Sequence, residues 1–405
     1  GGLKFDYFSP NEKHRFNVFA SAQHINRDSY YGGGQDPNAY GNTTDLNWMA
    51  GSQYVYSFGK CIFMPADLTA GIEFNQDKLE DNMWGYHRTV DQKVNIGSAF
   101  FQNEWKNEHW GFLIGGRLDK HNLIDHVIFS PRANLRYNPT ENINLRFSYS
   151  SGFRAPQAFD EDLHVENVGG NVAMVELADN LKEERSQSLS ASADIYHRFG
   201  AFQVNFLVEG FYTKLSDVFA LTDGEVVDGI LTRTRYNAPG ARVMGLTLEG
   251  KMAYLTKFQV QAGITLQQSH YSEPHVWNKE APAVKKMMRT PNTYGYFTAT
   301  YTPIKPLSIA LSGTYTGSML VPHEPVPGFL EKPITVNTKD FFDIGLKAAY
   351  DFKLYKSMNL QVNAGVQNIF NAYQNDFDKG ADRDSGYIYG PSLPRSFFAG
   401  VKISY

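Results

Sequence analysis

The chain has 405 residues, a formal net charge of −4 and a single cysteine, Cys61. Balanced charge gives no basic surface for nucleic acid, and one cysteine cannot form an internal disulfide. No run of about 18 apolar residues occurs, which excludes a transmembrane helix. Aromatic residues make up 14% of the chain, with 24 Tyr and 29 Phe.

About sixteen strand-like segments follow one another along the chain. We predict strands at residues 13–25, 46–58, 67–77, 94–106, 109–120, 130–138, 142–152, 186–198, 201–220, 230–254, 257–271, 292–303, 307–317, 340–351, 358–370 and 395–405.

Residues 142–150 show the alternation that indicates a half-apolar strand. One face carries Ile143, Leu145, Phe147 and Tyr149. The residues between them are polar, and residues 358–367 repeat the pattern. Since side chains alternate between the two faces of a strand, each segment has one apolar and one polar face. The polar faces explain why the mean hydropathy of −0.40 resembles that of a water-soluble protein.

The connections between these segments alternate between short and long. The tight connections are residues 106–108, 138–141, 199–200, 255–256, 303–306 and 352–356. The long ones are residues 26–45, 78–93, 153–185, 272–291, 318–339 and 371–394. Antiparallel strands that cross a bilayer place every second connection on the same side. The pattern therefore predicts a transmembrane β-barrel with short periplasmic turns and long extracellular loops.

Four segments carry recognisable motifs. Residues 130–156 contain Ser-Pro-Arg-Ala, Asn-Pro-Thr-Glu-Asn and Ser-Gly-Phe-Arg-Ala-Pro. Residues 179–186 read Asp-Asn-Leu-Lys-Glu-Glu-Arg-Ser, residues 368–373 read Asn-Ile-Phe-Asn-Ala-Tyr, and residues 394–400 read Pro-Arg-Ser-Phe-Phe-Ala-Gly. In this order they resemble TonB-dependent outer-membrane receptors, in a style similar to Bacteroidetes sequences. The segment at 179–186 lacks both prolines of the corresponding family motif.

The resemblance implies an all-β, antiparallel transmembrane barrel of about 22 strands, with a plug domain in its lumen. This chain supplies about sixteen strands and no plug or TonB box. It also shows no signal peptide before its first strand pattern. We therefore expect residues 1–405 to form a single β-barrel domain, the C-terminal portion of a longer receptor in the bacterial outer membrane.

The function that the resemblance implies is TonB-dependent active import of a large, scarce solute: a ferric siderophore, haem or a corrinoid. The implied partners are the TonB–ExbB–ExbD energy-coupling system, acting through the missing plug and TonB box, the lipid bilayer with its lipopolysaccharide, and a surface lipoprotein. A passive porin of about sixteen strands is the alternative. An outer-membrane hydrolase is a third hypothesis, but no Gly-x-Ser-x-Gly motif supports enzymatic activity.

A tyrosine-rich segment at residues 30–41 is a candidate ligand-binding loop. Its candidate contact residues are Tyr30, Tyr31, Asp36 and Tyr40. Tyrosines on a glycine-rich loop can close over a planar ligand by stacking and hydrogen bonding. The alternative is that glycine, proline and asparagine form turns and the tyrosines belong to the aromatic girdle.

The predicted loop at 153–185 holds two further candidates, Arg154 and His164. In the haem-receptor branch that this loop resembles, a histidine lies between a Phe-Arg-Ala-Pro motif and an Asn-Pro-Asp/Asn-Leu motif, and His164 occupies that interval. A neutral imidazole is a good iron ligand. Solvation is the alternative for His164, and anchoring of the loop to wall carboxylates is the alternative for Arg154.

The last predicted loop contains acidic residues two positions apart with glycines between them. They are Asp376, Asp378, Asp382 and Asp384. Several carboxylate oxygens in such an array suit calcium, a hard cation. The alternatives are solvation or pairing with Lys379 and Arg383. Calcium is the only cofactor that the sequence suggests.

Overall fold

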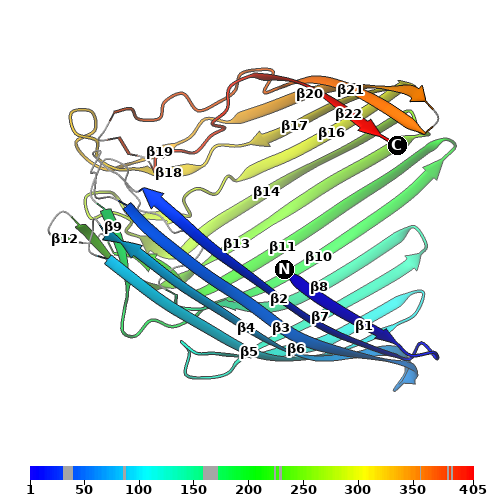
Figure 1. The fold of residues 1–405 in the computed structure, drawn as a ribbon, viewed down its shortest axis with the longest axis horizontal. Coiled ribbons are helices and arrows are strands. Elements are labelled where there is room, and N and C mark those ends of the chain that lie inside the picture. Colours follow the sequence, from blue (N-terminus) through cyan, green and yellow to red (C-terminus); the bar gives the residue numbers. More distant parts are fainter. Residues whose placement is uncertain are drawn as a thin grey trace.

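The computed structural model describes residues 1–30, 40–84, 88–157, 172–222, 225–227, 230–355, 357–380, 383–384 and 386–405. Long strands form one sheet (Figure 1): β1 (Gly2–Phe8), β2 (His14–Tyr30), β3 (Tyr40–Cys61), β4 (Met64–Met83), β5 (Arg88–Lys106), β6 (Trp110–His121), β7 (Ile128–Thr140), β8 (Ile143–Arg154), β10 (Glu184–Phe199), β11 (Phe202–Leu221), β13 (Ile230–Tyr254), β14 (Phe258–His275), β16 (Thr293–Ile304), β17 (Leu307–Thr316), β20 (Phe341–Tyr355), β21 (Met358–Gln367) and β22 (Ser396–Ser404).

Short strands accompany this sheet near one end. They are β9 (Val172–Leu177), β12 (Glu225–Val227), β15 (Val284–Lys286), β18 (Leu320–His323) and β19 (Ile334–Asn337). β9 and β12 pair with β13, and β15 pairs with β14. β18 and β19 form a separate two-stranded sheet. Within the described residues, no helix is long and apolar enough to span a membrane.

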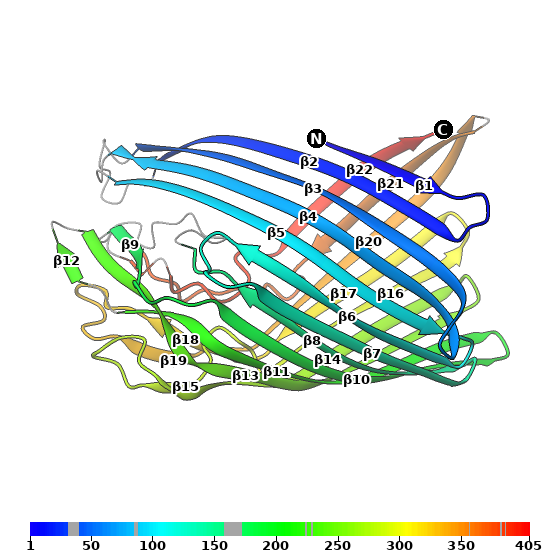
Figure 2. The same ribbon diagram turned by 90° about the horizontal axis from the view of Figure 1, so that it is seen from below.

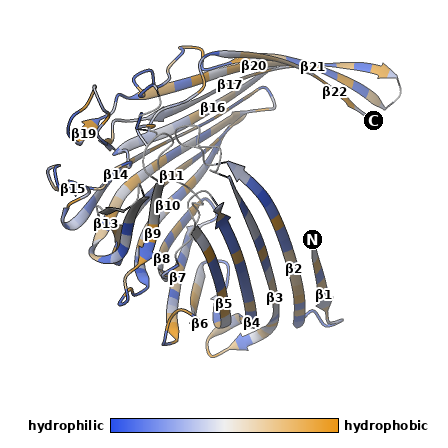
Figure 3. Cartoon of the chain, turned by 60° about the vertical axis from the view of Figure 1, so that its left-hand side comes forward, coloured by the Kyte–Doolittle hydropathy of each residue, from blue (hydrophilic) through white to orange (hydrophobic). Residues whose placement is uncertain are grey.

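Every pair of neighbouring long strands is antiparallel, and each strand pairs with the long strand that follows it in the sequence. In the described part of the chain, β1 pairs with β2 alone and β22 with β21 alone. Figure 3 shows these two strands at the separate edges of a curved wall. The all-β, antiparallel fold class predicted from the sequence is confirmed.

The predicted alternation of faces is also confirmed. Phe147 and Tyr149 of β8 pair with Ala191 and Leu189 of β10, whereas Ser148 pairs with Ser190. The Phe147 side chain is 48% exposed although it is large and apolar. Exposed apolar residues on one side of a barrel wall face lipid. We therefore call the side of Phe147 the lipid face and the side of Ser148 the lumen face. Figure 3 shows the alternating hydropathy along the strands.

Several predicted boundaries were wrong because strand pairing continues beyond the apolar segments. Residues 78–93 were expected to form a long loop, yet Lys78 pairs with Lys93 and the hairpin continues to Met83 and Arg88. The loop expected at 26–45 is likewise shortened, because β2 and β3 pair as far as Tyr30 and Tyr40. Polar side chains support these extensions: the Thr43 hydroxyl donates to Asp81 Oδ1 over 2.6 Å.

Two further corrections concern the first strand and one turn. β1, a strand of 7 residues, was missed although Leu3, Phe5 and Tyr7 alternate with Lys4 and Asp6. The tight turn expected at 352–356 instead follows Tyr355, which pairs with Met358, so β20 is longer than predicted. In both places the pairing with the neighbouring strand defines the extent of the strand.

Gly71 of β4 is a position where the neighbouring strands leave no space for a side chain. A Cβ there would lie 2.6 Å from the Ser52 carbonyl oxygen and would overlap the Phe100 ring. We expect Gly71→Val to lower the free energy of unfolding by about 1–3 kcal/mol, because overpacking strains the sheet. Urea unfolding of the detergent-refolded protein, followed by tryptophan fluorescence, measures this change.

The matched control is Gly97→Val on β5, where a Cβ meets no atom within 4 Å. This variant should change stability by no more than about 0.5 kcal/mol. Equal unfolding midpoints for the two variants would show that the close approach at Gly71 is unimportant.

Candidate functional site

The long connections and short strands gather at one end of the sheet, and the tight turns lie at the other (Figure 2). In outer-membrane barrels the long connections lie outside the cell. We therefore call this end the extracellular rim. A ligand arriving from outside would first meet the residues of this rim.

Three side chains from separate strands meet on the lumen face of the rim. The guanidinium carbon of Arg154, at the end of β8, lies 5.6 Å from the centroid of the Phe219 ring on β11. The guanidinium carbon of Arg235 on β13 lies 5.8 Å from the same centroid. Both distances are within the range of cation–π attraction. We call these three residues the arginine–phenylalanine group.

Backbone contacts hold this group in place. The Phe219 N–H donates to Glu184 Oε2 on β10 over 3.0 Å. Arg235 Nη1 donates to the carbonyl oxygen of Gln157 over 2.8 Å. Since β10 lies between β8 and β11, four adjacent strands position the group. The result is a rim surface that combines two positive charges with an aromatic ring.

A second cluster joins β18 to the segment between β21 and β22. The His323 and Asp378 side chains are only 6% and 5% exposed, and His323 Nε2 lies 2.9 Å from Asp378 Oδ2. The His323 ring stacks on Tyr387, with 3.8 Å between centroids and 6° between planes. This stacked, buried pair fixes the last extracellular segment against β18.

Tyr389 and Asp376 extend this cluster. The Tyr389 hydroxyl donates to the Asp376 carboxylate over 2.6 Å, and the Tyr387 hydroxyl lies 3.5 Å from the same carboxylate. Burial raises the pKa of the Tyr389 phenol, and its hydrogen bond to Asp376 raises that pKa further. Burial and the Asp376 charge also raise the pKa of Tyr387. Both phenols therefore remain neutral donors at physiological pH.

The described acidic residues of this segment accept hydrogen bonds from the protein. Asp378 accepts from the Asp384 N–H over 3.1 Å, and Asp384 accepts from the Glu324 and Gly386 N–H groups over 2.9 and 2.8 Å. Asp382 lies outside the described residues. Among those that are described, no group of three or more His, Cys, Asp or Glu side chains is arranged to hold a metal ion. Calcium binding stays a prediction.

The tyrosine segment is strand at its described positions, Tyr30, Tyr40 and Gly41. Tyr30 pairs with Tyr40, and their ring centroids lie 4.9 Å apart. The uninterrupted register of β2 places Tyr30 on the same face as Phe16 and Val18, which is the lipid face. Ligand contact by Tyr30 and Tyr40 stays a prediction, and it would involve the outward side of this hairpin. The other candidates, Tyr31, Asp36 and His164, lie outside the described residues.

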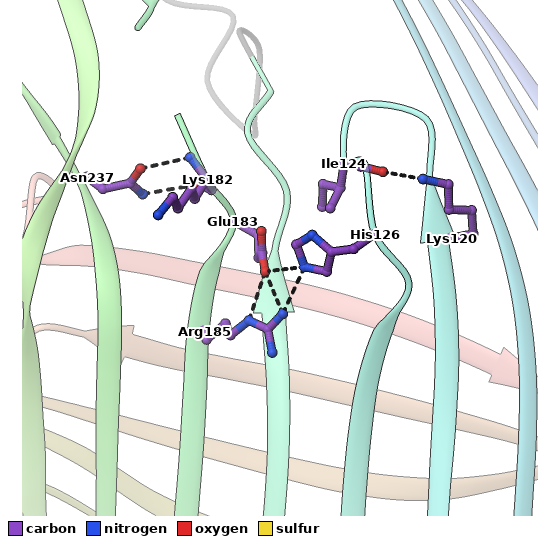
Figure 4. A network of polar contacts seen from close by, with 7 residues as sticks. All are labelled: Lys120, Ile124, His126, Lys182, Glu183, Arg185 and Asn237. Atoms are coloured by element: carbon purple, nitrogen blue, oxygen red, sulfur yellow. Dashed lines mark hydrogen bonds and ion pairs between the residues drawn. The ribbon is translucent and has the colours of Figure 1, made fainter. Parts of the chain in front are cut away.

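A third rim cluster anchors the segment before β10, and Figure 4 shows it. Glu183 is 6% exposed and its Oε1 accepts from Arg185 Nη2 over 2.6 Å and lies 3.0 Å from His126 Nε2. The adjacent backbone is held as well, since the Lys182 N–H donates to Asn237 Oδ1 over 2.8 Å. Burial alone would raise the Glu183 pKa, but the hydrogen bonds and charge of Arg185 more than offset it and lower the pKa.

Sequence reasoning found Arg154 but missed the residues that it meets. Phe219 and Arg235 lie on strands that were predicted correctly, yet which rim residues become neighbours depends on strand register. His323 was not among the candidate residues. A signal was available for it, because the aspartate array that it contacts had been recognised.

A family profile described as "TonB dependent receptor-like, beta-barrel" matches residues 2–369. The chain belongs to this TonB-dependent receptor family. No curated protein shows a significant match to the chain.

Solved receptor structures share the fold of this TonB-dependent receptor chain. A mutant of the ferric enterobactin receptor from Pseudomonas aeruginosa matches with a TM-score of 0.71 and 17% identity, covering 99% of this chain and 60% of that one. The siderophore receptor PirA from Acinetobacter baumannii matches with a TM-score of 0.69 and 16% identity, covering 99% of this chain and 61% of that one. The FrpB iron transporter from Neisseria meningitidis matches with a TM-score of 0.68 and 16% identity, covering 99% of this chain and 62% of that one. The chain thus spans about three fifths of the length of these proteins.

The TonB-dependent receptor family and these structures are outer-membrane receptors and transporters rather than enzymes. The predicted outer-membrane location and family are therefore confirmed. Membership also favours the receptor hypothesis over the porin and hydrolase hypotheses.

One receptor motif has a structural role in this chain. Asn368 and Asn371 have φ angles of 49° and 56°, which asparagine tolerates better than most residues. Asn368 Oδ1 accepts the Ala372 N–H over 2.8 Å, and Asn371 Oδ1 accepts the Arg395 N–H over 2.9 Å. The motif ends β21 and ties the chain to the start of β22.

The Glu183 anchor should weaken in acid. Because its folded-state pKa is lowered from an ordinary value near 4.5, Glu183 stabilises the rim above that value. The contribution is lost as pH falls through the lower folded-state pKa. We expect amides 178–185 to lose hydrogen-exchange protection below about pH 4, after correction for intrinsic exchange rates.

Glu183→Gln is the test variant, because it removes the titrating group and retains the side-chain shape. Its protection should be lower at neutral pH and should not fall further in acid. An acid-dependent loss that persists in Glu183→Gln would assign the transition to another group.

Proposed function

We propose that this chain forms the wall of an outer-membrane receptor that imports a ferric siderophore by TonB-dependent active transport. The observation that carries the proposal is the arginine–phenylalanine group on the lumen face of the extracellular rim, in a chain of this family. Names of similar structures support the cargo class, since they include a ferric enterobactin receptor and a siderophore receptor. Haem and corrinoids are the alternative cargoes.

The chemistry of the rim suits an anionic chelate with flat ligand groups. A guanidinium forms charge-assisted hydrogen bonds with anionic oxygens and also stacks on planar groups. Phe219 holds Arg154 and Arg235 near one another and offers an aromatic surface beside them. Such a surface favours a negatively charged complex over a neutral sugar of similar size.

Import against a gradient requires energy, which we assign to TonB–ExbB–ExbD acting on a plug domain and TonB box. In this proposal the rim captures the chelate and the plug controls its passage inward. A surface lipoprotein remains a further proposed partner.

The test is titration of the full-length receptor in detergent with a ferric catecholate siderophore, haem and cobalamin, followed by tryptophan fluorescence. We expect sub-micromolar binding of the ferric siderophore. Arg154→Gln/Arg235→Gln should weaken binding by about tenfold or more, because each cation contributes roughly 0.5–2 kcal/mol.

Arg136→Gln is the matched control, because Arg136 lies at the tight-turn end of the sheet, where its Nη2 donates to the Asn107 carbonyl oxygen over 2.9 Å. It should leave siderophore affinity unchanged within about twofold. Preferential binding of haem or cobalamin would show that this compound, and not a ferric siderophore, is the cargo. No binding of any of the three, together with steady conductance in planar bilayers, would instead support a passive channel.

A further inference from the structure

Three arginines follow one line along the lumen face of β7 and β8. Arg154 lies at the rim end of β8, and Arg146 lies near the tight-turn end of the same strand. Between them, Arg132 of β7 pairs with Ser150 of β8. Because Ser150 lies midway between the other two arginines, successive members are separated by about 13 Å along the strand, at about 3.4 Å per residue. We call Arg154, Arg132 and Arg146 the arginine line.

The two inner members carry positive charge that no described carboxylate neutralises. Arg132 forms no hydrogen bond or ion pair with any described residue, and Arg146 Nε donates only to Asn144 Oδ1, over 2.7 Å. Arg136, directly opposite Arg146, adds a further positive charge. By contrast, Arg117 on the lumen face of β6 forms ion pairs of 2.9 and 2.8 Å with two carboxylates. Arg132 and Arg146 are also exposed, so both guanidinium groups remain available to an anion in the lumen.

Carboxylates lie beside only the two ends of the arginine line on β10. Glu184 pairs with Arg154 at the rim, where its Oε2 accepts the Phe219 N–H. At the other end, Asp194 accepts hydrogen bonds from the Tyr196 hydroxyl and the Asn205 amide. Both acidic side chains are therefore engaged by neighbouring groups, and the lumen face of β10 between them carries no charge.

Hydroxyl groups occupy the lumen face between these ends. On β8 and β10 every lumen-face residue between the end positions is small: Ser148, Ser150, Gly152, Ser186, Ser188, Ser190 and Ser192. We call these seven residues the hydroxyl strip. Small side chains leave the wall low beside the longer arginines, and a hydroxyl can donate to an anionic oxygen. The strip thus provides neutral donors between the positive charges.

We propose that the arginine line and the hydroxyl strip form the path along which an anionic ferric chelate leaves the rim and moves toward the periplasm. This inference rests on the proposed function. Its first member, Arg154, belongs to the arginine–phenylalanine group, and the line continues from there along the same strand. A wall that carries one sign of charge over a low-dielectric layer concentrates ions of the opposite sign.

The separation of the arginines also suits passage better than capture. Conduction requires sites that attract a solute but release it to the next site. Two exposed guanidinium groups about 13 Å apart provide separate, weak sites, whereas a tight site would need them to converge on one position. An acidic surface of the plug domain is the competing occupant of this wall, and the experiment distinguishes the two.

The test uses cells that produce the full-length receptor and a ferric catecholate siderophore labelled with radioactive iron. Binding is measured in energy-depleted cells, and the maximal uptake rate is measured in energised cells. We expect Arg132→Gln/Arg146→Gln to retain the binding affinity within about twofold but to lower the maximal uptake rate about tenfold, the lower end of the range for focused charge. Arg132→Lys/Arg146→Lys should recover most of the lost rate, because it restores the charge.

A charge of opposite sign tests the hydroxyl strip. Ser190→Asp places an anion on the strip, and it should lower the uptake rate without weakening binding at the rim. Its matched control is Ser312→Asp on the lumen face of β17, which should take up the chelate as the unmodified receptor does. Lys347→Gln/Lys402→Gln is the matched control for the arginines, because it removes two cations from the lumen faces of β20 and β22.

Four results would overturn the proposal. Unchanged uptake by Arg132→Gln/Arg146→Gln, with normal binding, would exclude the path while leaving the proposed function intact. Equal loss in the lysine control would assign the effect to total lumen charge. Increased sensitivity of the arginine variant to a large antibiotic that the outer membrane normally excludes would assign the arginines to plug contact. Absence of siderophore binding by the unmodified receptor would refute the proposed function and this inference with it.

Discussion

Backbone hydrogen bonding in a solvent without water is the constraint on which this structure depends. In hydrocarbon an unpaired N–H or C=O costs several kcal/mol, so a spanning strand needs neighbours on both sides. Among the described residues, all long strands except the edge strands β1 and β22 have them. The long ladder between β11 and β13, from Phe202–Tyr254 to Leu221–Arg235, satisfies this requirement. Tight turns at one end set the register, and register in turn assigns every side chain to lipid or lumen.

Outside the membrane, contacts between side chains hold the segments of the extracellular rim together. His323 and Asp378 form a buried pair under Tyr387, and Glu183 is held by Arg185. These clusters join segments that are distant in sequence, and they use charge-assisted hydrogen bonds that are partly removed from water. The acidic array of the last segment is accordingly part of the rim's internal structure as well as a candidate for cation binding.

The two faces of the same strands present different chemistry to different partners. On β13, Arg235 points to the lumen with the arginine–phenylalanine group, whereas Arg242 lies on the lipid face. A shift of register by one residue would exchange these roles. One set of strands therefore combines a polar surface toward the lumen with an apolar surface toward lipid.

The sequence by itself determined the approximate positions of most strands, the two-faced pattern and the receptor family, because alternation and short motifs are local properties of the chain. Arg154 was also visible within its motif. Only the tertiary structure showed that Arg154 and Arg235 approach Phe219 and that His323 meets Asp378. Such neighbours are decided by register across strands and by the course of long connections. Neither leaves a periodic trace in sequence, because backbone pairing is nearly independent of side-chain identity.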